Sequence, residues 1–139
     1  MAGDGLAVTR RLHTIRRIVE VKRQQCRATD WALARLKRDE QALLDEERAI
    51  VEALNADQPL HGLFMETMAR HLRAVAGKLE AVRQEAAAEQ LRQRTQKGQL
   101  RQAERMLAEA ERQERRAAES KELTEIVEMT AARGAASLP

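Results

Sequence analysis

Large apolar residues recur at alternating steps of four and three along the first third of the chain. This spacing lasts for about six heptads and is the seam of a coiled-coil helix. The seam consists of Val8, Leu12, Ile15, Val19, Cys26, Leu33, Leu36, Leu43, Ile50 and Leu54. The pattern predicts one long helix over residues 6–55.

A loop over residues 56–62 is expected to end this helix. Pro59 lacks a backbone donor and keeps its preceding residue out of helical geometry, while Gly62 permits turn conformations. A second seam follows, at Met65, Met68, Leu72, Val75, Leu79, Val82, Ala86, Leu100, Ala103, Leu107 and Ala110. It predicts a helix over 63–133 and a frayed tail over 134–139.

The short loop makes the two helices antiparallel neighbours. The expected fold is therefore all-α, a single coiled-coil hairpin over residues 1–139 whose second helix is the longer one. In this register Leu43 lies beside Val75, and Leu36 lies beside Val82.

Both seams turn polar at one level of the hairpin. The polar seam residues are Lys22, Cys26 and Thr29 on the first helix and Glu89, Gln93 and Gln96 on the second. One interpretation is that their long side chains lie at the edge of the seam and reach water. The other is that this polar layer, with Gly98 beside it, fixes the register or lets the hairpin bend.

The longer second helix is expected to leave an overhang. Its last two dozen residues would extend past the first helix by roughly 35 Å, at about 1.5 Å per residue. Leu123, Ile126 and Val127 share one helix face there with Thr130, out of phase with the earlier seam. These residues need another partner, or the segment frays.

Composition excludes most other classes of protein. One Phe, one Trp and no Tyr among 139 residues cannot fill a conventional globular core, and charged residues make up 34% of the chain. The 25 basic and 22 acidic residues are interleaved, so no concentrated basic face for nucleic acid is expected. With one cysteine, no bilayer-spanning run and no secretion signal, a cytoplasmic location without direct membrane insertion is expected.

No residue pattern indicates catalysis. The histidines at 13, 61 and 71 are isolated, and Cys26 has no second thiol near it, so no metal site is expected. The chain has no glycine-rich phosphate loop and no nucleophile motif. We therefore expect a non-enzymatic protein without a cofactor.

Trp31 is a candidate contact residue, because it should point away from the seam. An exposed indole is a strong interface anchor, but it can equally lie flat over Ala28, Ala34 and arginine stems. Ile18 and Val21 also lie outside the seam and favour a contact surface.

Basic residues gather near the N-terminus, where the usual interpretation is a solvated helix face. The run consists of Arg10, Arg11, Arg16, Arg17, Lys22, Arg23 and Arg27, against Asp4 and Glu20. Because it lies at the same end as the overhang, it could guide that end into an acidic socket.

Two stretches have more specific patterns. From Arg115 to Ile126, a basic stretch leads to a lysine, a large apolar residue, an acid and another apolar residue, at Lys121, Leu123, Glu125 and Ile126. From Gly62 to Met68, just beyond the loop, the chain places Phe64 and Met68 one turn apart. These stretches resemble the FliJ stalk proteins of the flagellar export apparatus and their YscO relatives in virulence type III secretion. The first matches the closing pattern of that family, except that Ser120 and Thr124 stand where Gln and Asp are usual. The second is similar to the family's Phe and Leu stripe, whose next two positions are occupied by His71 and Val75.

The resemblance implies a cytoplasmic stalk, peripheral to the export apparatus at the inner membrane. Its partners would be the hexameric export ATPase, the export gate protein and export chaperones. The implied ATPase-binding residues are Arg10, Arg11, Arg16, Arg17, Lys121, Leu123, Glu125, Ile126 and Val127, and the implied gate-binding residues are Phe64, Met68, His71 and Val75. The alternative is a coiled-coil scaffold or chaperone-like adaptor that self-associates through residues 111–133.

Overall fold

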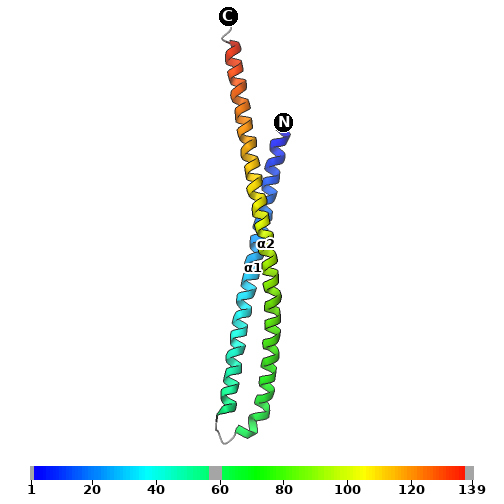
Figure 1. Ribbon diagram of the computed structural model, residues 1–139, viewed down its shortest axis with the longest axis vertical. Helices are drawn as coiled ribbons and strands as arrows, with labels where there is room; N and C mark the ends of the chain where they lie inside the picture. The colour runs from blue at the N-terminus through cyan, green and yellow to red at the C-terminus, as the bar shows by residue number, and fades with distance from the viewer. Residues whose placement is uncertain (1, 57–60, 137–139) are drawn as a thin grey trace. The chain divides into compact units, whose positions relative to one another are not determined.

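The computed structural model describes residues 2–56 and 61–136, which form two α-helices (Figure 1). Helix α1 spans Ala2–Asn55 and has 54 residues, and α2 spans His61–Ala136 and has 76 residues. No strand occurs in the described ranges. The predicted all-α class and the helical hairpin with a longer second helix are confirmed.

The helices are longer at three ends than the sequence predicts. α1 begins at Ala2 rather than Leu6, and α2 begins at His61 and ends at Ala136. Glycine costs about 1 kcal/mol relative to alanine inside a helix, which weakens a terminal turn without forbidding it. Glycines at 62 and 134 are therefore helical. Residues 57–60 of the expected loop and 137–139 of the expected tail lie outside the described residues.

The hairpin divides into two compact units. We call residues 1–24 with 98–139 the terminal unit and residues 25–97 the loop unit. The division on α2 falls at Gly98, beside the predicted polar layer, where neither helix supplies a large apolar seam residue. Each unit is described by itself below.

The core of the terminal unit comes from both helices. Its buried residues are Leu12, Ile15, Val19, Ala103 and Ala110, with Leu100 and Leu107 packed against them. Large side chains of α1 thus meet small alanines of α2, as in the alternation of knobs and holes in a coiled coil. Full burial of one such leucine or valine contributes about 1.5–3 kcal/mol.

The loop unit buries a second stretch of the same seam. Its buried apolar residues are Cys26, Leu33, Leu36, Ile50, Val75 and Leu79. Exposed pairs of ionisable side chains also join the helices, among them His71 Nε2 at 2.7 Å from Glu46 Oε1 and Arg83 Nε at 3.4 Å from Glu40 Oε1. Pairs this exposed contribute little to stability, so the apolar seam holds this unit together.

Candidate partner-binding surfaces

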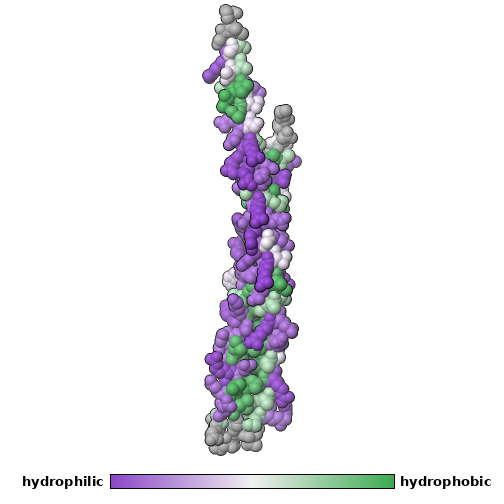
Figure 2. Space-filling model, in the orientation of Figure 1, coloured by the Kyte–Doolittle hydropathy of each residue, from purple (hydrophilic) through white to green (hydrophobic). Residues whose placement is uncertain are grey.

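The last part of α2, which we call the overhang, is exposed throughout residues 118–136. The exposed fractions are 63% for Leu123, 52% for Ile126 and 65% for Val127. Met129, which the sequence analysis missed, is also exposed, although its place three residues after Ile126 puts it next to the same face. Figure 2 shows hydrophobic residues gathered on this part of α2. Several large apolar side chains are thus available to a partner.

The polar residues of the overhang fall into two kinds. Thr124 and Thr130 donate to the carbonyl oxygens of Ser120 and Ile126, both at 2.9 Å, so their hydroxyls are used within the helix. The charged residues are exposed and mainly acidic, namely Glu119, Lys121, Glu122, Glu125, Glu128 and Arg133. A partner would meet an apolar face bordered mostly by negative charge.

The predicted basic run lies on α1 in the terminal unit. Arg10, Arg11, Arg16 and Arg17 are all exposed. The same unit also contains the overhang, so the two predicted parts of the ATPase-binding surface belong to one compact unit.

A groove on α1 of the terminal unit adds a feature that the sequence analysis only partly anticipated. Its lining residues are Thr14, Arg17, Ile18, Val21 and Lys22. Ile18 and Val21 are 43% and 51% exposed, as expected from their places outside the seam. Lys22 Nζ donates to Gln99 Oε1 at 3.0 Å, which holds this ammonium between the two helices. The groove therefore combines an apolar floor with two basic side chains.

The four predicted gate-binding residues differ in their exposure. Phe64 is 53% exposed, and Met68 is half-buried. His71 is exposed and paired with Glu46 of α1. Val75 is 1% exposed, and its side chain belongs to the seam of the loop unit. A partner that docks on the closed hairpin can reach Phe64, Met68 and His71, but not Val75.

Trp31 points into solvent, with an exposed fraction of 73%. It belongs to the loop unit, where Leu33 and Leu36 on the same helix are buried in the seam. Because Leu33 and Leu36 face the seam, Trp31 lies on the opposite side of the helix. A partner contact at Trp31 stays a prediction.

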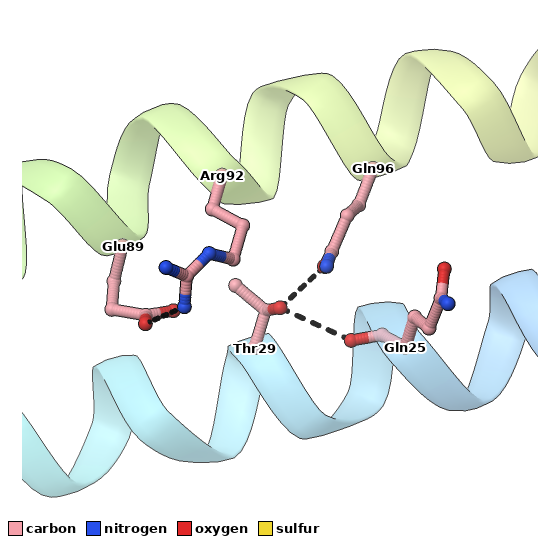
Figure 3. A network of polar contacts seen from close by, with 5 residues as sticks. All are labelled: Gln25, Thr29, Glu89, Arg92 and Gln96. Carbon is pink, nitrogen blue, oxygen red and sulfur yellow. Dashed lines mark hydrogen bonds and ion pairs between the residues drawn. The ribbon is translucent and has the colours of Figure 1, made fainter.

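The polar layer of the loop unit is centred on Thr29, which is only 4% exposed (Figure 3). Its Oγ1 lies 3.1 Å from the carbonyl oxygen of Gln25 and within hydrogen-bonding distance of the Gln96 side-chain amide. Both partner atoms are acceptors, the Gln25 carbonyl oxygen and Gln96 Oε1, so the single hydroxyl proton of Thr29 is donated to one of them at a time.

Two further contacts complete this layer. Gln93 Nε2 donates to Asp30 Oδ1 at 2.7 Å, and Arg92 pairs with Glu89 on the same helix. Gln93 and Gln96 are half-buried. The buried, bonded Thr29 does not fit the interpretation that every residue of the layer reaches water. It fits a contact that holds the register of the loop unit.

Within residues 2–56 and 61–136, no three His, Cys, Asp or Glu side chains come close enough together to hold a metal ion. Cys26 is buried as a free thiol. Across the same described ranges, neither helix has a stretch apolar enough to cross a bilayer.

Comparison with protein-family models, curated proteins and solved structures finds no match to this chain. The resemblance to the FliJ and YscO proteins stays a prediction, which depends on the residues quoted for it above.

Proposed function

We propose that this protein is the non-enzymatic stalk of a bacterial type III protein export apparatus, either flagellar or virulence-associated. In this role the terminal unit inserts in the hexameric export ATPase, and the loop unit contacts the export gate. The protein would act in the cytoplasm, at the periphery of the apparatus on the inner membrane. The observation that supports the proposal most is the overhang, whose apolar residues have no use within the hairpin.

The overhang suits insertion into a protein ring for an energetic reason. Leu123, Ile126 and Val127 are each more than half exposed. Covering them with a partner makes the free energy of binding more favourable by about 25 cal/mol for every Å² of apolar area removed from water. Arg10, Arg11, Arg16 and Arg17 of the same unit can pair with carboxylates around a pore, where water is partly excluded. Lys121 and Glu125 add charge of both signs to the overhang.

The start of α2 suits a separate contact with the gate protein. Phe64 and Met68 lie four residues apart and therefore share a helix face. Phe64 is exposed, and Met68 is half-buried, so an apolar partner can cover both. His71 continues this face one turn further on, where Glu46 holds its ring.

The test measures the binding of a truncated protein and of a double variant to a purified export ATPase and gate protein from the same organism. Removal of residues 119–139 should abolish ATPase binding and stimulation, because the exposed apolar face is lost. The double variant Phe64→Ala with Met68→Ala should leave ATPase stimulation unchanged and weaken gate binding by about 10-fold or more. Circular dichroism checks that both variants remain helical.

A matched control separates side-chain contacts from helix length. Leu123→Ala with Ile126→Ala keeps the overhang at full length and should also lose ATPase binding, whereas Glu128→Ala should retain it. Full ATPase stimulation by the truncated protein would rule out the insertion of the overhang. Loss of stimulation in the Phe64 and Met68 variant would contradict the division of labour between the two units.

A further inference from the structure

The overhang and the groove of the terminal unit are complementary in charge. Over residues 118–136 the overhang contains four glutamates, one lysine and one arginine. The groove instead contains Arg17 and Lys22 around an exposed apolar floor, and Arg10 and Arg11 precede it on the same helix. Each surface thus offers an exposed apolar face, bordered mainly by negative charge on the overhang and by positive charge at the groove.

The overhang cannot reach the groove of its own chain. Ala103 packs in one core cluster with Ile15 and Val19, so the groove around Ile18 lies near the level of Ala103 on α2. Ile126 lies roughly 35 Å further along the helix, at about 1.5 Å per residue. Since α2 is helical without interruption to Ala136, it cannot fold back over that distance. If the overhang covers such a groove, the groove must therefore belong to another molecule.

From these features we infer that two copies of this chain form a reversible dimer in which each overhang occupies the groove of the other copy. A two-fold axis allows both contacts to form at once, because the second copy runs in the opposite direction. The helices α1 and α2 are antiparallel within a copy, so each overhang runs parallel to the α1 helix of the other copy.

The dimer places matching groups next to one another. Ile126 and Val127 cover Ile18 and Val21, which removes apolar area from water on both sides. Glu122 lies one helical turn before Ile126, and Arg17 lies next to Ile18, so these charges border the apolar contact and can pair across it. The two-fold axis makes this contact twice.

The dimer and the export ATPase would use the same residues. The inference itself does not depend on the proposed function, because it concerns the protein alone. If both hold, dimerisation covers the overhang until the ATPase is present, and binding to the ring requires the dimer to dissociate. The two proposals can therefore be rejected independently. Sedimentation of the pure protein tests the dimer, and the assay with the ATPase tests the stalk.

The test is sedimentation equilibrium of the full chain with charge-exchange variants. The unaltered protein should show a monomer–dimer equilibrium with a Kd of roughly 10–100 µM at low salt, weakened by added salt. Arg17→Glu and Glu122→Arg should each weaken dimerisation about 10-fold or more, because each places like charges across both contacts. Mixing these two variants should restore dimerisation, because both contacts of the heterodimer then pair opposite charges.

Matched controls use charges outside the contact. Arg23→Glu lies on α1 beyond the residues that line the groove, and Glu128→Arg lies on the side of the overhang away from Ile126, so neither should change the Kd more than about 2-fold. A chain that stays monomeric at about ten times the upper expected Kd would overturn the inference. A dimer that survives both Arg17→Glu and Glu122→Arg would overturn it as well, since its interface would then lie elsewhere.

Discussion

The two parts of α2 on either side of Ala117 form one helix, yet only the first part has a packed face. From Met68 to Ala117, residues at steps of three and four are buried or half-buried, whereas every residue over 118–136 is exposed. The exposed part contains Leu123 and Ile126, which are larger and more apolar than the buried Ala103 and Ala110. Burial here therefore depends on whether a residue of α2 faces α1 and on whether α1 extends that far, rather than on the hydrophobicity of the residue itself.

The largest expected difference between these parts is in the cost of truncating a leucine. Leu36→Ala should lower the free energy of unfolding by about 2–4 kcal/mol, because Leu36 is 3% exposed in the seam. Leu123→Ala on the overhang should change it by no more than about 0.5 kcal/mol. Urea unfolding followed by circular dichroism measures both values. Equal losses for the two variants would mean that the overhang is packed in solution.

The polar layer tests whether the seam can be improved. Replacing Thr29 by Val and Gln96 by Leu together should stabilise the chain by about 1 kcal/mol, since both partners of a half-buried hydrogen bond become apolar. Gln96→Leu alone should have a smaller effect, because Thr29 keeps the carbonyl oxygen of Gln25 as its acceptor. Thermal unfolding of the three proteins provides the comparison. A destabilised double variant would show that the layer contributes more to stability than apolar packing would.

Gly98 lies where α2 passes from one compact unit to the other, and Gly77 inside the loop unit serves as its matched control. A methyl group added at Gly98 or at Gly77 would meet no atom within 4 Å beyond the local backbone of its own helix, so each Gly→Ala change should stabilise by about 0.5–1 kcal/mol through helix propensity alone. If Gly98 is a point of local opening, Gly98→Ala should also slow hydrogen exchange over residues 89–98. Gly77→Ala should leave exchange in that stretch unchanged. The same slowing in both variants would argue against a special role for Gly98.

The smallest effect is expected from removing the overhang altogether. Deletion of residues 119–139 removes no buried side chain of the described part of the chain, so the free energy of unfolding should stay within about 0.5 kcal/mol. The helical signal should fall in proportion to the helix that is lost. A substantial drop in stability would show that the overhang packs on the hairpin or on another copy at the concentration used.

Heptad spacing predicted most of the fold, because a seam repeated over many turns leaves little ambiguity about which side of each helix is buried. Leu12, Val19, Leu36 and Val75 were all expected in the seam, and all are buried. The helix ends at Ala2 and His61 were misplaced because local signals such as glycine shift the free energy of a terminal turn only slightly.

The candidate sites were predicted less completely. The overhang followed from the mismatch in helix lengths, and the outward orientation of Trp31 followed from its phase. The groove did not, since Thr14, Arg17 and Lys22 are polar residues that no apolar pattern in the sequence marks. The burial of Val75 could have been inferred, because the same residue had been assigned to the seam and to the gate surface, and one side chain cannot occupy both.

The exposed Trp31 determines what optical methods can detect in this protein. The chain has no tyrosine and no second tryptophan, so one indole supplies nearly all of its near-ultraviolet absorbance and emission. Because this indole is already 73% exposed in the folded chain, unfolding should hardly shift its emission maximum. A ligand or partner that covers the ring would move the emission to shorter wavelength. The natural fluorescence is therefore a poor probe of folding and a selective probe of binding next to Trp31.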